Sequence, residues 1–300
     1  MDELYKRIKN LEGCSLEENI DLKGLTTFKL TSFGDVVEVR SVEALQKLLP
    51  LLVQFQKPYL VVGWGANQIL PAKCESLILH LDFPFDLSYL DEKKDEYILP
   101  ASLGINHLTS HAVKFALKGW EVITGIPASL GGAIYMNAGT NLGEIGSFVK
   151  KVKVVTQEGV IREEVINEKS FSYRHNHFVR PGEVIVEATL IHLGIDETIP
   201  QKIKDYLEYR KRTQPLATKN CGCVFKNPAK ELQAGRLIDL LGLKGFVVGP
   251  LRISPKHANF MENTGGANWD HFSSLLEVIQ VEMDHFYGIE FELEVKIPYN

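Results

Sequence analysis

The chain has 300 residues, of which 45% are hydrophobic and 24% are charged. That length can bury a full hydrophobic core and suggests two domains. The formal net charge is -5 at pH 7, and this weakly acidic balance argues against nucleic acid as a partner, because phosphate binding needs a basic surface. No apolar run approaches the roughly 20 residues that span a bilayer, and residues 1–19 lack the apolar core of a signal peptide. We therefore expect a cytoplasmic protein that does not bind membranes.

The four cysteines give little support to a metal site. Cys14, Cys74, Cys221 and Cys223 form no Cys-x-x-Cys pair, which disfavours zinc binding and thioredoxin-like chemistry. Reduced thiols are typical of a cytosolic protein. We expect no metal.

The first two thirds of the chain contain an irregular mixture of helices and strands. Apolar residues at helical spacing predict helices over residues 4–11, 42–55 and 105–117. Short apolar runs predict strands over residues 36–40, 59–62, 77–81, 97–100, 152–156 and 184–193. Because the two types do not alternate regularly, the pattern favours an α+β fold over a doubly wound sheet.

A second domain is expected beyond Ile199 and Pro200. Helices are predicted over residues 201–211, 234–241 and 269–287, followed by an extended segment over 291–298. This part comprises about one hundred residues, which is enough for a separate domain.

Two glycine-rich loops are candidates for holding a dinucleotide. The first, Gly63-Trp64-Gly65-Ala66-Asn67-Gln68, follows a predicted strand, but it lacks the third glycine and the following helix of a Rossmann motif. An ordinary tight turn explains it equally well.

The second loop, Gly125-Ile126-Pro127-Ala128-Ser129-Leu130-Gly131-Gly132, gives a stronger signal. Its glycines allow close approach to a ligand, and exposed N–H groups in such a turn can bind a pyrophosphate. Pro127 would suit the first turn of a helix. The alternative is a glycine-packed contact between a helix and a sheet. Two such loops favour extended FAD, and the candidate cofactor residues are Gly63, Gly65, Ala66, Asn67, Gln68, Gly125, Ile126, Pro127, Ser129, Gly131, Gly132, Asn137 and Ala138.

Basic residues in the second half indicate an anionic substrate. Arg174 follows Tyr173 in an aromatic run, and the planar guanidinium fork of arginine matches carboxylates and phosphates. A structural salt bridge is the commoner role of a lone arginine. Lys211, Lys226 and Asn227 add a local basic site to a net acidic protein, although a charge run is often only a solvated face.

Cys223 is a candidate proton donor. Gly222 and Pro228 bracket a predicted short strand on which Cys223 and Phe225 share one face. A buried thiol is usually inert, but near cations it can exchange a proton close to neutral pH, since its ordinary pKa is about 8.5. Glu294 lies on an alternating segment whose exposed carboxylates carry little information alone.

Together these motifs resemble the UDP-N-acetylenolpyruvoylglucosamine reductase (MurB) family, in its shorter subtype. The resemblance runs from Leu25-Thr26-Thr27-Phe28 to the C-terminus and is most specific over residues 125–139, 173–174 and 222–228. Further matching motifs are Gln214-Pro215, Ala234-Gly235-Arg236-Leu237-Ile238, Gly242-Leu243-Lys244-Gly245 and Lys256-His257-Ala258-Asn259-Phe260.

The resemblance implies a two-lobed PCMH-type FAD-binding domain and a C-terminal α+β substrate-binding domain. Applied to this chain, it gives an N-terminal helix over residues 1–20, an FAD-binding domain over 21–195 and a substrate domain over 196–300. The two lobes would cover about 21–80 and 81–195.

The resemblance also implies the reaction. NADPH, as co-substrate, reduces non-covalently bound FAD, and the reduced flavin passes hydride to the enolpyruvyl ether of a UDP-sugar, giving UDP-N-acetylmuramate for peptidoglycan. That product serves cell-wall biogenesis and division. Arg174 would stabilise charge on the substrate carboxylate beside Glu294, and Cys223, where serine is usual, would supply the proton. The implied substrate anchors are Tyr173, Lys211, Lys226 and Asn227.

Some features depart from the family pattern, and some alternatives stay open. Ala66 replaces a serine, and Thr31-Ser32-Phe33-Gly34 stands where two adjacent glycines are usual. The alternatives are another FAD-dependent oxidoreductase of the same fold and a non-catalytic flavin or nucleotide-sugar binding protein. The sequence does not give the oligomeric state, with a monomer among the options.

Overall fold

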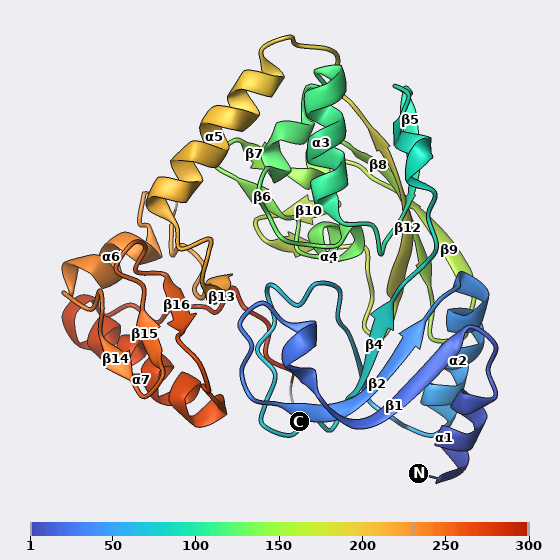
Figure 1. Cartoon of the computed structure of the whole chain (residues 1–300), viewed down its shortest axis with the longest axis horizontal. Coiled ribbons are helices and arrows are strands. Elements are labelled where there is room, and N and C mark those ends of the chain that lie inside the picture. Colours follow the sequence, from blue (N-terminus) through green and yellow to red (C-terminus); the bar gives the residue numbers. More distant parts are fainter. Residues whose placement is uncertain (1, 230, 299–300) are drawn as a thin grey trace. The chain divides into compact units, whose positions relative to one another are not determined.

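The computed structural model describes residues 2–229 and 231–298, and its mixture of helices and strands confirms the α+β class (Figure 1). It forms two compact units. Unit 1 takes in the described parts of Met1–Glu18, Val36–Gly63 and Leu77–Glu208. Unit 2 takes in those of Asn19–Asp35, Trp64–Ser76 and Tyr209–Asn300. Two early segments of the chain therefore belong to the same unit as its C-terminal part.

The first sheet has the strand order β1-β2-β4-β3, and β4 pairs in parallel with both of its neighbours. These strands are β1 (Cys14–Asp21), β2 (Phe33–Val39), β3 (Tyr59–Val61) and β4 (Leu77–Leu81). Two helices, α1 (Asp2–Lys9) and α2 (Val42–Gln54), supply apolar side chains to the same core. The side chain of Ser41 caps α2 by accepting from Ala44 N, and the helix continues through Pro50.

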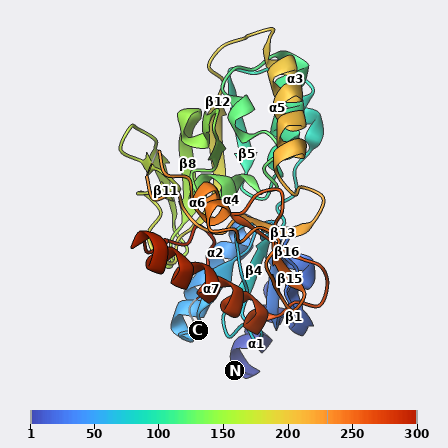
Figure 2. The same ribbon diagram turned by 90° about the vertical axis from the view of Figure 1, so that its left-hand side faces the viewer.

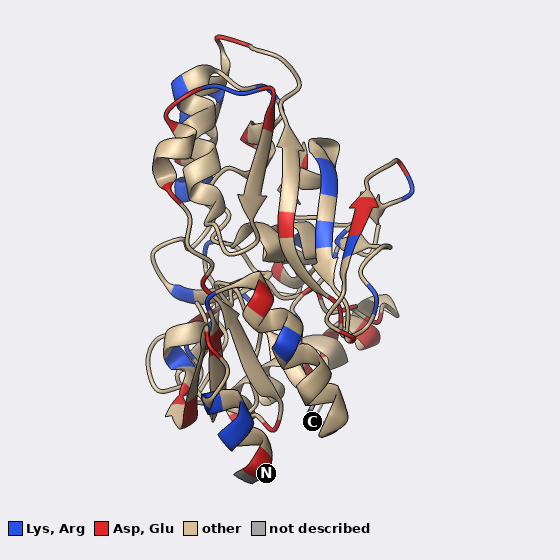
Figure 3. Cartoon of the chain, turned by 90° about the vertical axis from the view of Figure 1, so that its right-hand side faces the viewer, with Lys and Arg blue, Asp and Glu red and all other residues tan. Residues whose placement is uncertain are grey.

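The second sheet of unit 1 is antiparallel, with the order β5-β12-β8-β9. Its strands are β5 (Glu96–Pro100), β8 (Val149–Val155), β9 (Ile161–Val165) and β12 (Val184–Ile191). Cross-strand ion pairs join β8 to both neighbours, at Lys151–Glu163 and Lys153–Glu187, and basic and acidic residues alternate across these strands in Figure 3. On the buried face, the cluster around Trp120 packs with α3 (Ile105–Phe115) and α4 (Leu130–Tyr135).

Short elements complete unit 1. They are the two-residue pairs β6 (Gly139–Thr140) with β7 (Gly143–Glu144) and β10 (Phe171–Ser172) with β11 (His175–Asn176). Helix α5 (Ile199–Thr213) starts in unit 1 and ends in unit 2. The 3-10 helices of unit 1 span Leu87–Leu90, Trp120–Ile123 and Ile145–Ser147, and a further one in unit 2 spans Leu22–Leu25.

Unit 2 is built on an antiparallel sheet with the order β13-β16-β15-β14. Its strands are β13 (Lys219–Cys223), β14 (Val247–Val248), β15 (Leu251–Ile253) and β16 (Phe260–Asn263), and its helices are α6 (Ala234–Leu240) and α7 (Trp269–Tyr287). The long helix α7 packs against β14 and β15 (Figure 2). Phe28, Leu30 and Ile69 from the two early segments are buried in this core. These residues explain why residues 19–35 and 64–76 belong to unit 2.

The predicted strand after Gly222 is wrong in its bounds. Strand β13 begins at Lys219 and ends at Cys223, so it precedes most of the predicted segment. Gly222 has a φ of 77°, and the register with β16 shifts between Asn220 and Cys223. Because β13 ends at Cys223, the alternation does not continue to Phe225, which is fully buried whereas Cys223 is half-buried.

Buried histidines predict a loss of stability in mild acid. His111 is buried against Tyr97 and Trp120, and this burial lowers the pKa of His111 below its ordinary 6.5, with the nearby backbone of Leu90 opposing the shift and Lys114 and Lys94 adding to it. The unfolded chain therefore binds a proton before the folded chain does as the pH falls. The contribution of neutral His111 to the free energy of unfolding is therefore fully present above pH 6.5. It is lost as the pH falls from 6.5 toward the lower pKa of the folded state.

The measurement is the thermal unfolding midpoint between about pH 7.5 and pH 5.5. His111→Gln removes this titration and leaves that of His257 in unit 2, whose pKa is also lowered by burial and by Lys244. We expect a flatter midpoint profile in this variant than in the original chain. An unchanged profile would show that His111 does not contribute.

None of the helices within residues 2–229 and 231–298 is long and apolar enough to cross a membrane. Within the same described ranges, no group of three or more His, Cys, Asp or Glu side chains is arranged to hold a metal ion.

Candidate functional site

In unit 1 the second glycine-rich loop closes against the end of β3. A Cβ at Gly63 would lie 2.2 Å from Ser129 Oγ, so only glycine fits there without moving that hydroxyl. Ser129 is the N-cap of α4, and its Oγ accepts from Gly132 N at 3.4 Å. The helix begins at Leu130, so the prediction that Pro127 occupies the first helical turn is wrong; Pro127 lies in the irregular segment between Gly125 and Ser129.

Gly131 has a packing role of its own. A Cβ at this position would lie 2.8 Å from Ala101 Cβ, and Gly131 N donates to Ala101 O at 2.8 Å. Leu130 N likewise donates to Leu103 O. The glycines of this loop thus allow α4 to approach β5 and the turn after it, which matches the packing alternative that the sequence left open. Gly125 has a φ of 73°, and Ile126 N donates to Ile123 O in the turn that leads into the loop.

Asn137 and Arg174 are brought together in unit 1. Arg174 donates to Gly139 O at 3.0 Å and to Asn137 O at 3.5 Å, and its side chain is 17% exposed. Both residues have positive φ, at 43° for Asn137 and 54° for Arg174. Positive φ is uncommon in residues with a side chain and concentrates at functional sites. Ala138 follows directly, and its carbonyl accepts from Ile145 N.

Glu144 joins this cluster and was missed by the sequence analysis. It accepts from Asn137 Nδ2 at 2.7 Å and lies 3.6 Å from Arg174 Nη1. A lone glutamate between a glycine and an isoleucine matches no motif, and only the β6–β7 pairing reveals its neighbours. Tyr173 lies in the turn between β10 and β11, half exposed, with the Arg174 guanidinium 5.0 Å from its ring centroid.

In unit 2 the first loop lies against the segment that carries Glu294 and Lys296. Asn67 Nδ2 donates to Glu294 O at 3.1 Å, and Lys296 N donates to Asn67 O at 2.8 Å. Gln68 forms an isolated parallel bridge with Lys296. The predicted cofactor loop and the segment that carries Glu294 are therefore neighbours within one unit.

This first loop contains backbone donors that suit a phosphate. The backbone N–H groups of four consecutive residues, Trp64, Gly65, Ala66 and Asn67, donate to no acceptor within the part of the chain that the structure describes. Gly65 is buried and has a φ of 57°, and buried donors without acceptors are rare in proteins unless a ligand or water binds them. Successive N–H groups around a left-handed residue form an anion-binding concavity. The residues present thus fit the diphosphate of FAD, even with Ala66 in place of a hydroxyl.

Gly65→Ala is expected to weaken flavin retention by about 10- to 100-fold, since a strained left-handed residue costs about 1–3 kcal/mol. A Cβ there would lie 2.0 Å from Leu25 O and 2.8 Å from Thr26 Cα, which are backbone atoms that cannot rotate away. The measurement is the dissociation constant of FAD by fluorescence titration. Gly242→Ala is the matched control, because Gly242 also has positive φ (72°) but would meet nothing within 4 Å. Equal FAD affinity in both variants would contradict the prediction.

Cys223 and Glu294 lie on adjacent segments of unit 2. Glu294 N donates to Val224 O at 2.8 Å, directly after Cys223, and Phe225 bridges Leu293. Cys223 is half-buried at the end of β13. Two residues earlier, Cys221 is buried in the core, and burial raises its pKa to about 12. Of these two thiols, Cys223 is the more exposed.

The predicted substrate anchors differ in their surroundings. Lys226 forms an ion pair with Glu292, and Lys226 N donates to Glu292 O at 2.8 Å. Asn227 Oδ1 accepts from Ala234 N at 3.0 Å, so the amide fixes the start of α6. Lys211 is exposed near the end of α5, where its carbonyl accepts from Lys256 Nζ at 3.1 Å. Lys226 and Asn227 therefore already hold protein groups in place.

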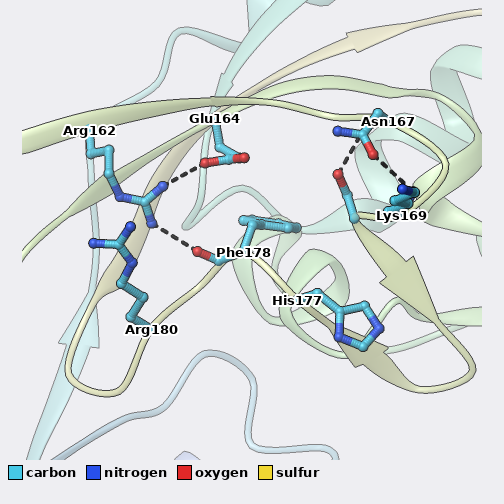
Figure 4. Close-up of a pocket in the computed structure, with 8 residues that line it drawn as sticks. Arg162, Glu164, Asn167, Lys169, His177, Phe178 and Arg180 are labelled. Carbon is cyan, nitrogen blue, oxygen red and sulfur yellow. Dashed lines mark hydrogen bonds and ion pairs between the residues drawn. The ribbon is translucent and has the colours of Figure 1, made fainter.

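A cavity of about 250 Å³ lies elsewhere in unit 1, around Arg162, Glu164, Asn167, Lys169, Ser170, His177, Phe178 and Arg180 (Figure 4). Its central guanidinium, Arg162, donates to Glu164, Glu183 and Phe178 O. None of the predicted site residues lines it. Because its best-buried cation is already paired with two carboxylates, the cavity is not the candidate site.

Two family models match the chain. One, described as an FAD binding domain, matches residues 35–163. The other, described as the C-terminal domain of UDP-N-acetylenolpyruvoylglucosamine reductase, matches residues 214–298.

Full-length relatives and a solved structure agree with these models. A UDP-N-acetylenolpyruvoylglucosamine reductase of Heliobacterium modesticaldum is 34% identical over 91% of this chain and 87% of its own length. One from Thermotoga sp. is 32% identical over 100% of this chain and 99% of its own. The crystal structure of UDP-N-acetylenolpyruvylglucosamine reductase (MurB) from Thermus caldophilus superposes with a TM-score of 0.80 at 30% identity, covering 95% of this chain and 99% of that one.

Proposed function

Because the chain belongs to the UDP-N-acetylenolpyruvoylglucosamine reductase family, we propose that it reduces UDP-N-acetylenolpyruvoylglucosamine to UDP-N-acetylmuramate for peptidoglycan synthesis. The observation that carries this function is the extent of the likeness, which covers both the FAD-binding part and the C-terminal domain. FAD, when bound, would supply the hydride-transfer chemistry between NADPH and the methylene carbon of the enolpyruvyl ether. The side chains of the protein would bind the cofactor and the substrate, stabilise the developing charge and donate the proton.

The cofactor would be held by both glycine-rich loops. The open N–H groups of residues 64–67 support a diphosphate contact, and the closeness of Gly63 to Ser129 supports a shared role for the two loops. The proposed FAD-binding domain covers residues 21–195, and the substrate domain covers 196–300. The proposed contacts are Gly63, Gly65, Ala66, Asn67, Gln68, Gly125, Ile126, Pro127, Ser129, Gly131, Gly132, Asn137 and Ala138.

Arg174 would bind the substrate carboxylate and stabilise the negative charge that builds there as hydride arrives. Its fixed guanidinium, held by Gly139 O and Asn137 O, supports this role, since a preorganised donor needs no rearrangement during the reaction. Glu294 would act alongside it. Tyr173 and the anchors Lys211, Lys226 and Asn227 would bind the remaining parts of the UDP-sugar.

Cys223 would donate the proton to the carbon next to the one that receives the hydride. A thiol is a stronger acid than the serine hydroxyl usual in the family, so it can perform this step. The half-buried position of Cys223 supports access by substrate, in contrast with Cys221.

The test follows the flavin absorbance under anaerobic conditions. NADPH should bleach the protein, and UDP-N-acetylenolpyruvoylglucosamine should then restore the colour in a stoichiometric amount. Bleaching without restoration would indicate a different substrate, and a protein that neither carries nor binds flavin would overturn the function. Because NADPH and UDP-sugars are cytoplasmic metabolites, we also place the reaction in the bacterial cytoplasm.

A further inference from the structure

We propose that Glu144 is a positioning residue that holds Arg174 in its carboxylate-binding orientation. The inference rests on the proposed function, which gives Arg174 that task. Glu144 is the end of the β6–β7 pair, and its carboxylate reaches two groups of unit 1 at once. One oxygen accepts from Asn137 Nδ2 at 2.7 Å, and the other lies 3.6 Å from Arg174 Nη1.

The two contacts of the Glu144 carboxylate are of different types, one a hydrogen bond and the other an ionic contact. At 2.7 Å the bond from Asn137 is a short hydrogen bond to a charged acceptor, which is the stronger class. At 3.6 Å the approach to Arg174 is too long for a hydrogen bond and acts through charge. The pair is only partly exposed, at 17% for Arg174 and 35% for Glu144, so solvent screens it less than a surface ion pair.

Asn137 transmits the position of Glu144 to the arginine. Its Oδ1 accepts from Gly146 N at 3.1 Å, its Nδ2 also donates to Ser172 O at 3.1 Å, and its own carbonyl accepts from Arg174. Ser172 is the last residue of β10, immediately before the turn that carries Arg174. The side-chain amide of Asn137 therefore connects the residue before the Arg174 turn, Ser172, to Glu144 of the β6–β7 pair.

Backbone strain explains why these contacts are needed. Asn137 and Arg174 both have left-handed φ values, which are strained for a residue with a side chain. A strained conformation persists only where its surroundings hold it. Removing the Glu144 carboxylate takes away the charged acceptor of Asn137 and the anionic neighbour of Arg174 together.

The test compares Glu144→Ala with Glu144→Gln, and uses Glu163→Gln as the matched control. Glu163 also pairs with a basic side chain of unit 1, Lys151, at 2.9 Å, but outside this cluster. For Glu144→Ala we expect the rate of substrate-dependent flavin reoxidation to fall about 10- to 100-fold, which is typical of misplaced catalytic groups. Glu144→Gln, which keeps an acceptor oxygen for Asn137, should recover a large part of it. Bleaching by NADPH should change less than about threefold in every variant.

A binding measurement separates positioning from general damage. Glu144→Ala should weaken binding of UDP-N-acetylmuramate, which has the carboxylate, about tenfold, and should leave UDP-N-acetylglucosamine, which lacks it, within about twofold. Equal weakening of both ligands would overturn the inference, as would tighter binding of the carboxylate ligand to Glu144→Gln, which would mean that Glu144 competes with it. An original chain that bleaches with NADPH but ignores the enolpyruvyl substrate would instead refute the proposed function.

Discussion

Replacing Cys223 by alanine is expected to slow substrate-dependent reoxidation of the flavin by about 10²- to 10⁴-fold, which is the usual contribution of a general acid. The side chain is half-buried at the end of β13, and the backbone of the next residue pairs with Glu294. Without the thiol, no group at this position can supply the proton. The reduction of the flavin by NADPH needs no such proton and should stay within about threefold of the original rate.

The measurement is a pair of stopped-flow half-reactions, with Cys223→Ser and Cys221→Ala as partners. Serine restores an O–H at the same position and should recover much of the rate. Cys221 is buried, and burial raises the pKa of its thiol to about 12, so its loss should affect packing but not proton transfer. If Cys223→Ala turned over at the original rate, the proton would have to come from another group.

Elements with strong local signals could be predicted from the sequence. Helix α7 has the predicted bounds, because Asn268 forms a capping box with His271 at its start and Gly288, with a φ of 61°, ends it. Strand β4 was likewise predicted over its full length, since it is a short apolar run that is largely buried. In both cases the information lies within the segment itself.

Contacts that depend on distant segments could not be predicted. Phe28 and Ile69 are buried in the core of unit 2, although both lie at least 150 positions before β13, and no local pattern encodes that contact. The strand expected after Gly222 failed for a related reason. The bulge opposite β16 shifts the register, and only the partner strand reveals it.

The candidate site shows the same division. Gly65 was predicted from its loop, but the backbone of Leu25 that demands a glycine there comes from an earlier turn. Glu144 was missed altogether, because its significance lies in its closeness to Asn137 and Arg174. A motif identifies which residues matter, whereas their neighbours follow from pairings such as β6–β7.

Trp120→Ala is expected to destabilise unit 1 by about 3–5 kcal/mol, the usual cost of removing a fully buried aromatic side chain. Trp120 has no exposed surface and contacts the rings of Tyr97, His111 and Phe148. Truncation would leave a cavity between α3 and the second sheet, because neighbouring rings held in a packed core relax only partly. The measurement is the free energy of unfolding from urea titration, taken from the transition that reports on unit 1.

Two further variants divide this cost into its parts. Trp120→Phe keeps an aromatic ring but removes the bond from Nε1 to Ile191 O, 2.8 Å long, so it should cost about 1–3 kcal/mol for a buried carbonyl left without its donor. Phe286→Ala removes an aromatic side chain that is 62% exposed on α7, and it should cost less than about 1 kcal/mol. If Trp120→Ala cost no more than Phe286→Ala, Trp120 could not be the centre of the core beneath the second sheet. A Trp120→Phe variant as unstable as Trp120→Ala would instead place most of the energy in the hydrogen bond rather than in the filled volume.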